Sequence, residues 1–100
     1  MLDLARVLGF DWDDGNARKS LDKHAVSQKE AEEVFFDPVL LMLDDVKHSQ
    51  AEQRFQALGN SPAGRRLHVA FTMRDNGTRL RVISARHMNR KERALYEQEA

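Results

Sequence analysis

The sequence predicts an α+β fold: a small, mostly antiparallel β-sheet with two N-terminal helices and one C-terminal helix. Two helical patterns with their own caps precede residue 38, and a capped helical pattern closes the chain. Between them, residues 54–86 read as strands joined by short turns, which is typical of antiparallel pairing. Helices before and after such strands predict a helical layer on one face of the sheet, in the order β-α-α-β-β-β-β-α.

Length and composition set the outer limits of the prediction. The chain has 100 residues, 41% of them hydrophobic, which suits one domain (residues 1–100) with one core. The absence of cysteine excludes disulfides and thiolate metal sites. No apolar run approaches the roughly 20 residues that span a bilayer. Asp3 and Arg6 interrupt the first ten residues, so this leader segment (1–9) does not resemble a signal peptide, and we expect a cytoplasmic protein.

The first elements are a strand and two helices. Residues 10–13 alternate apolar and polar, as in a short half-buried strand. Asp13 or Asp14 can cap a helix that ends at His24. Residues 27–30 match a capping box, and the second helix directs Ala31, Val34 and Phe35 inward. It stops before the Asp-Pro pair at 37–38, because the residue before proline disfavours helix.

The remaining elements follow from alternation and turn residues. Residues 39–43 form an apolar run of strand length, and 44–51 form a polar loop. Strands are predicted over 54–58, 67–73 and 79–86, with turns at 61–64 and 75–77. The second turn contains Asn-Gly, which suits the positive φ of a type I′ turn. Asn89 and Glu92 repeat the cap-and-box pattern before a final helix that runs to about Glu99.

Charge is distributed unevenly although the net charge is zero. Residues 1–50 carry six basic and eleven acidic side chains, a net −5, whereas residues 51–100 carry ten basic and five acidic ones, a net +5. A basic surface for an anionic partner is one interpretation. The other is that the two halves simply neutralise each other in the fold.

Alternation sorts the predicted strands into an apolar and a polar face. The apolar face holds Phe55, Ala57, Val69, Phe71, Leu80 and Val82, while the other face holds Arg54, Gln56, His68, Thr72, Arg74, Arg79 and Arg81. Ile83 breaks this phase and indicates either a bulge or burial on both faces near the end of that strand. Guanidinium groups suit phosphate oxygens, so this face can bind RNA. The alternative is an ordinary solvated face with cross-strand ion pairs.

The four histidines offer no metal-binding spacing, and no cofactor is predicted. The chain has no glycine-rich phosphate loop, nucleophile elbow or dinucleotide fingerprint. His24 ends the first helix and His48 lies in the polar loop, where either can be an ordinary helix-end or solvated residue. His87 follows the last strand beside Arg86 and can line a cleft next to the final helix.

Three segments in order resemble the BrnT family of bacterial toxins from type II toxin–antitoxin systems. The first is Phe10 to Asp13, followed by the stretch from Leu21 to Ser27. The second is residues 31–38, AEEVFFDP, and the third is RVISAR at 81–86 with Asn89 to Arg93 and Tyr96. The resemblance covers about residues 10–97. It departs at Asn16, Ser20 and Ala25, where the family often has Lys, Asn and Gly.

The resemblance implies a RelE-like ribonuclease that arrests growth, and a BrnA-like ribbon-helix-helix antitoxin. The two proteins would form a heterotetramer in which only the antitoxin contacts operator DNA. We therefore expect metal-independent RNA cleavage that blocks translation. The second hypothesis is a non-catalytic, degenerate toxin that only modulates its antitoxin's binding to the operator, as Asn16 and Ser20 suggest.

For RNA cleavage, the candidate catalytic residues comprise phosphate-binding arginines and a general acid and base. Arg54, Arg81 and Arg86 are the phosphate-binding candidates, and Lys23 and His24 are the leading acid and base. His68 and His87 are further acid–base candidates and, with Arg74 and Arg79, predicted RNA-binding residues. Glu92 is a possible base, but its capping-box role takes precedence.

Overall fold

The computed structural model describes residues 3–48 and 51–99, and its elements follow the predicted order. They are β1 (Gly9–Trp12), α1 (Asp14–His24), α2 (Gln28–Glu33), β2 (Leu41–Asp44), β3 (Arg54–Asn60), β4 (Arg66–Arg74), β5 (Arg79–His87) and α3 (Arg90–Glu99). Short 3-10 helices at Val34–Phe36 and Val46–His48 occupy parts of the two segments between α2 and β3. The α+β class with two N-terminal helices and one C-terminal helix is confirmed.

The strands form one sheet in the order β1-β5-β4-β3-β2. Strands β2 to β5 pair antiparallel with their neighbours, as the short turns between them predict. Strand β1 instead joins the outer edge of β5 in parallel, with Asp11 opposite Arg81. The sheet is therefore mostly antiparallel, and its one parallel pair joins the two ends of the chain.

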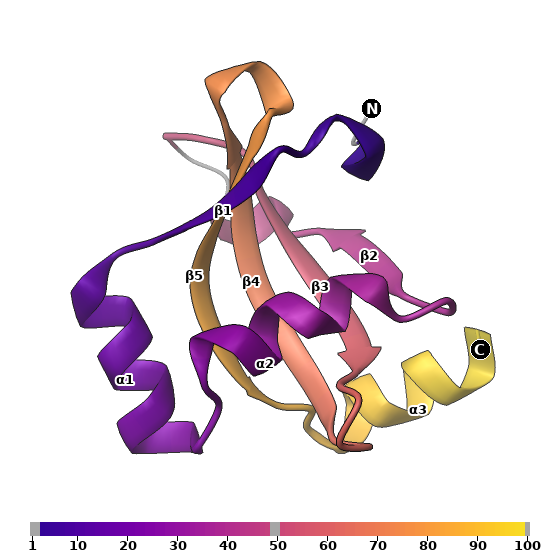
Figure 1. Cartoon of the computed structure of the whole chain (residues 1–100). Coiled ribbons are helices and arrows are strands. Elements are labelled where there is room, and N and C mark those ends of the chain that lie inside the picture. The colour runs from indigo at the N-terminus through magenta and orange to yellow at the C-terminus, as the bar shows by residue number, and fades with distance from the viewer. Residues whose placement is uncertain (1–2, 49–50, 100) are drawn as a thin grey trace.

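The main core lies between the sheet and the α2 segment, which crosses the sheet while α1 flanks β5 (Figure 1). Phe35, just after α2, contacts Phe71 edge-on with ring centroids 5.1 Å apart and also contacts Phe10 at 5.7 Å. The predicted apolar face is confirmed, since its residues are buried or pack against this core. The buried members of the core are Val26, Ala31, Val34, Ala57, Leu67, Val69, Phe71, Leu80, Val82 and Ala85.

Ile83 forms the predicted bulge. Ala70 pairs with Ser84 and Phe71 pairs with Val82, so Ile83 is an extra residue on β5. The bulge resets the alternation. Beyond it, Ala85 enters the core while Arg86 turns to the opposite face with His68, its register partner.

Helix α3 covers one end of the opposite face, so the helices do not all lie in one layer. Leu58 alternates with the core residue Ala57 and therefore projects from the other side of β3. It forms a second cluster with Met88 and Tyr96, against which Leu41 and Leu43 pack. An apolar residue on the otherwise polar face thus positions the C-terminal helix.

Two local predictions are corrected in detail. Asp75, Asn76 and Gly77 adopt positive φ of 52°, 56° and 84°, as the Asp-Asn-Gly sequence favours. The loop nevertheless spans four residues between the paired Arg74 and Arg79, so it is not a two-residue type I′ turn. The box at 27–30 is half formed: Ser27 accepts the Glu30 N–H, but the Glu30 carboxylate bonds to Ser61 and Arg65 instead.

Candidate functional site

The face of the sheet opposite α2 brings four of the predicted arginines together. The strand register places Arg54 opposite Thr72 and Thr72 opposite Arg81, and it places Arg74 opposite Arg79. Their neighbours in sequence, such as Phe71 and Leu80, point into the core, so these side chains lie on the other side. We call this the open face, defined by Arg54, Thr72, Arg74, Arg79 and Arg81 where α3 does not cover the sheet.

Three of these arginines pair with carboxylates. Arg79 Nε donates to Asp11 Oδ1 at 3.0 Å, and this hydrogen bond lowers the pKa of Asp11 against a smaller opposing effect of burial. Arg81 Nη2 lies 3.7 Å from Asp13 Oδ2, and Arg74 Nη2 lies 3.2 Å from Glu52 Oε1. Partners for Arg79 and Arg81 are available because β1 pairs with β5 in parallel.

These pairs correct the charge polarity suggested by the two halves of the sequence. Asp11 and Asp13 belong to the acidic half, but they lie beside the open-face arginines and not in the helical layer. For Arg79 and Arg81 the neutralising interpretation is therefore confirmed, whereas a basic surface for an anionic partner stays a prediction. The side chains in the pairs are about a third or more exposed, and such ion pairs contribute little stability.

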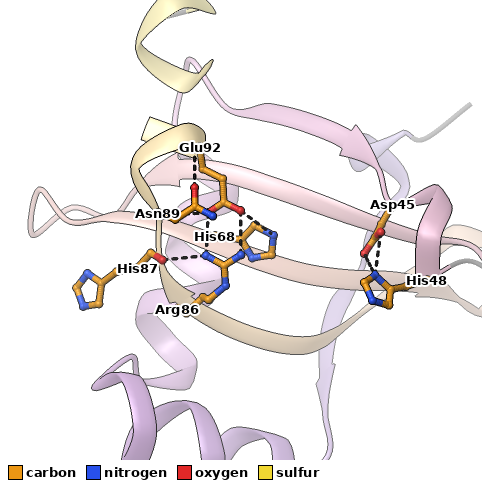
Figure 2. Close-up of polar contacts among 7 residues, drawn as sticks. All are labelled: Asp45, His48, His68, Arg86, His87, Asn89 and Glu92. Carbon is orange, nitrogen blue, oxygen red and sulfur yellow. Dashed lines mark hydrogen bonds and ion pairs between the residues drawn. The ribbon is translucent and has the colours of Figure 1, made fainter. Parts of the chain in front are cut away.

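At the α3 end, Arg86, Glu92 and His68 form a compact cluster (Figure 2). Arg86 donates from Nη1 and Nη2 to the two oxygens of Glu92, each at 2.8 Å. Asn89 and Glu92 also complete the predicted capping box: the Asn89 N–H donates to the Glu92 carboxylate, and Asn89 Oδ1 accepts the Glu92 N–H. Glu92 thus holds both the N-terminus of α3 and the Arg86 guanidinium.

Charge and burial set the protonation states in this cluster. Burial raises the pKa of Glu92, but the Arg86 and Asn89 hydrogen bonds outweigh it and keep that pKa below its usual value. His68 is 6% exposed, and burial lowers its pKa, reinforced by the Arg86 charge. Its Nε2 lies 3.9 Å from Glu92, and its Nδ1 has no hydrogen-bond partner in the described part of the chain. His68 is therefore held as a neutral imidazole.

A second histidine–carboxylate pair, formed by His48 and Asp45, was not identified from the sequence. His48 Nδ1 lies 3.0 Å from both carboxylate oxygens of the buried Asp45 (Figure 2). His48 lines a cavity of about 560 Å³ together with Lys47, Ala51, Glu52, Arg54 and Arg74. The spacing of Asp45 and His48, three residues apart in a polar segment, was a local signal for this pair.

The structure places Lys23, His24 and His87 elsewhere. Lys23 and His24 lie in the last turn of α1, and neither side chain makes a hydrogen bond or ion pair with a described residue. The His87 imidazole points away from the Arg86–Glu92 pair (Figure 2). It is close enough to Glu30 for its charge to lower the pKa of that carboxyl, after the larger effects of Arg65, burial and Ser61.

Residues 3–48 and 51–99 contain neither a candidate metal site nor a membrane-spanning helix. No group of three or more His, Cys, Asp or Glu side chains in these ranges is arranged to hold a metal ion. Their helices are all too short or too polar to cross a membrane.

Comparison with known proteins places this fold in a family. The family described as "Ribonuclease toxin, BrnT, of type II toxin-antitoxin system" matches residues 12–92. The crystal structure of the Brucella abortus ribonuclease toxin, BrnT, is similar, with a TM-score of 0.63 at 19% sequence identity, over 84% of this chain and 100% of that one. No curated protein sequence gives a significant match. The family match covers most of the chain, which therefore belongs to the BrnT family of ribonuclease toxins of type II toxin–antitoxin systems.

Proposed function

We propose that this chain is a metal-independent endoribonuclease that cleaves RNA on the open face and arrests growth by blocking translation. The observation that carries the proposal is the convergence of Arg54, Arg74, Arg79 and Arg81 on one side of the sheet. Guanidinium groups donate two parallel hydrogen bonds to phosphate oxygens. In this proposal the phosphate takes the place of the carboxylates that pair with three of them.

The proposed reaction is an internal transfer at one phosphodiester. A base removes the 2′-hydroxyl proton, the 2′ oxygen bonds to phosphorus, and the bond from phosphorus to the 5′ oxygen breaks. An acid protonates that 5′ oxygen, leaving a 2′,3′-cyclic phosphate and a 5′ hydroxyl. The arginines stabilise the additional negative charge on the phosphate in the transition state, a role that a metal ion has in other nucleases.

RNA cleavage by the purified chain in the presence of EDTA tests this function. We expect a cyclic-phosphate product, and we expect Arg54→Ala and Arg81→Ala to reduce the cleavage rate. His24→Ala examines the earlier acid–base prediction, which gains no support from the described contacts because Lys23 and His24 lie at the end of α1. Intact RNA after incubation with folded wild-type protein would contradict the proposal.

The departures from the family pattern lie in α1 or directly after it, and none of them replaces an arginine of the open face. Ser20 is buried, and its Oγ accepts the Ala85 N–H at 3.1 Å, so it stabilises the contact of α1 with β5. Ala25 ends α1 at φ 54°, a left-handed conformation that suits the family's glycine. Asn16 lies in the first turn of α1, where its N–H donates to Asp13. Normal growth on expression of the chain alone would favour the non-catalytic alternative.

The proposed partner is a BrnA-like ribbon-helix-helix antitoxin that forms a heterotetramer with this chain in the cytoplasm and alone contacts operator DNA. Exposed apolar side chains support a protein partner: Leu8 and Phe36 are 83% and 78% exposed and line an apolar cavity of about 320 Å³. We expect Leu8→Ser or Phe36→Ser to weaken neutralisation by the antitoxin. Leu95→Ser, on α3, is the matched control, and equal neutralisation of all three variants would exclude this surface.

A further inference from the structure

We infer that His48 is the general base of the proposed ribonuclease and that Asp45 is the positioning residue that orients it. This inference rests on the proposed function, because it assigns an atom to the step that removes the 2′-hydroxyl proton. Its structural basis is the Asp45–His48 pair beside Arg54 and Arg74 on the open face. No other described histidine combines a carboxylate hydrogen bond with a place in an arginine-lined cavity.

The tautomer of His48 follows from the charge of Asp45. Burial raises the pKa of Asp45, but hydrogen bonds from His48 and Gln56 outweigh that effect and keep the pKa below its usual value. Asp45 is therefore ionised near neutral pH, and an ionised carboxylate only accepts hydrogen bonds. The Nδ1 of His48 must carry the proton between them, so Nε2 is the unprotonated nitrogen of the neutral ring.

The surroundings fix the orientation of the pair. Asp45 is 9% exposed, and its N–H donates to the Arg54 carbonyl at 2.9 Å, which ties it to the first residue of β3. The His48 N–H donates to the Asp45 carbonyl at 3.2 Å within the 3-10 turn. The His48 side chain is 56% exposed and lines the cavity, so a substrate can approach the imidazole ring.

Besides a general base, the proposed RNA cleavage requires a binding site for the phosphate, and the cavity provides one. Lys47, Arg54 and Arg74 contribute three cationic side chains to its lining, against one carboxylate from Glu52. Glu52 already pairs with Arg74. A phosphodiester bound here would place a neighbouring 2′-hydroxyl within reach of an imidazole in the same lining.

His48 and a water molecule together carry the protons of the reaction. His48 Nε2 takes the 2′-hydroxyl proton, the 2′ oxygen bonds to phosphorus, and the 5′ oxygen leaves with a proton from water. The hydroxide formed then accepts the proton from His48, which returns the ring to its neutral state. Asp45 stabilises the imidazolium between these two transfers.

The test uses purified full-length protein and an RNA oligonucleotide. We expect His48→Ala to lower kcat by about 10²- to 10⁴-fold with little change in KM, as for loss of a general base. Added imidazole should restore part of that kcat. Asp45→Asn should give a smaller loss and disturb the acid limb of the pH profile, which Lys47, Glu52, Arg54 and Arg74 also influence through their charges. Asp44→Asn, the same change at an exposed neighbouring residue, is the matched control.

Two results distinguish failure of this inference from failure of the proposed function. Undiminished kcat in His48→Ala, while Arg54→Ala is impaired, would overturn the assignment of the base and leave RNA cleavage intact. Absence of cleavage by the wild type would instead overturn the proposed function. Imidazole ¹⁵N NMR provides a readout without substrate: protonation of Nδ1 in wild-type His48 supports the pair, and protonation of Nε2 contradicts it.

Discussion

Tyr96 Oη donates a 2.6 Å hydrogen bond to Asp37 Oδ2, and the same oxygen accepts the Asn60 N–H at 2.7 Å. Asp37 follows the α2 segment, Asn60 ends β3, and Tyr96 lies in α3 (Figure 1). The Asp37 carboxylate therefore joins the α2 segment to α3, beside the part of β3 that extends beyond β2. Sequence patterns placed Asp37 after the second helix and Tyr96 in the last helix, but they ended the strand before Asn60 and could not bring the three residues together.

Tyr96 should titrate far above an ordinary tyrosine. Burial raises its pKa to about 12, and the hydrogen bond to Asp37 acts in the same direction. The chain contains one tyrosine, so tyrosinate absorbance near 295 nm reports this group alone. We expect a midpoint near 12 in folded protein and near 10 in denaturant. An ordinary midpoint in folded protein would contradict the buried hydrogen bond.

The same shift gives stability a defined alkaline dependence. Because the folded-state pKa exceeds the unfolded value of about 10, the Tyr96 contribution is complete below pH 10 and is lost as pH rises toward 12. Tyr96→Phe should remove this contribution and should also lower the free energy of unfolding at pH 7 by about 1.5–3 kcal/mol, through loss of a hydrogen bond to a charged group.

The Ser20 side chain should contribute more to the free energy of unfolding than an exposed serine does. Its Oγ accepts the Ala85 N–H on the part of β5 that extends beyond β1. Ser20→Ala would leave that buried N–H without a partner, so we expect the free energy of unfolding to fall by about 1–3 kcal/mol. Ser84→Ala, an exposed site next to Ala85, is the control and should change it by less than about 0.5 kcal/mol. Equal urea midpoints for the two variants would show that the hydrogen bond is not significant.

The sequence predicted those parts of the fold that depend on neighbouring residues. Alternation over 67–73 assigned the core face, and the misplaced apolar Ile83 revealed the bulge. The parallel pairing of β1 was not predictable in this way, because Asp11 and Arg79 are 68 positions apart and a four-residue strand carries little information about its partner. The ion pairs of Arg79 and Arg81 depend on that pairing.

The same distinction applies to the candidate site. Arg54, Arg74, Arg79 and Arg81 share a face because their strands alternate, so period-two reasoning was sufficient to group them. The environment of His48 depends on how its 3-10 turn folds against β3 and β4. Only the folded structure therefore brings His48 into the same cavity as Arg54 and Arg74.

His68 should give stability a dependence on pH near neutrality. Burial and the Arg86 charge lower its folded-state pKa below the unfolded value near 6.5, with Glu92 and Asp45 acting weakly in the opposite direction. The unfolded chain therefore binds the proton first, and stability is lost as pH falls below about 6.5 through the folded-state pKa, at a slope of at most about 1.4 kcal/mol per pH unit.

Urea unfolding at several pH values between 7.5 and 5.5 measures this slope. We expect His68→Gln, which cannot become charged, to flatten the dependence in this range. His87→Gln, at an exposed position on the same strand pair, should leave it as in the wild type. If both variants retained the wild-type slope, the proton uptake would have to come from another group.

Arg74 allows a test of phosphate binding that is independent of catalysis. Its side chain is 43% exposed, lines the cavity with His48 and Arg54, and pairs with Glu52. Single-stranded RNA binding weakens with salt, with a slope of about −0.7 for each phosphate that a basic side chain neutralises. Arg74→Ala should therefore raise Kd and reduce the magnitude of that slope by about 0.7, if one phosphate contact is lost.

Binding would be measured with a 2′-O-methyl RNA oligonucleotide, which lacks the nucleophile and so cannot be cleaved, at salt concentrations from 50 to about 200 mM. Arg18→Ala removes the same charge from an exposed position on α1, away from the open face, and serves as the control. Equal loss of affinity in the two variants would indicate that RNA binding depends on the overall charge of the protein and not on a contact with Arg74. A weaker affinity and a smaller salt slope in Arg74→Ala alone would locate a phosphate at the cavity. The slope falls only when the substituted side chain had neutralised a phosphate and so released its counterion.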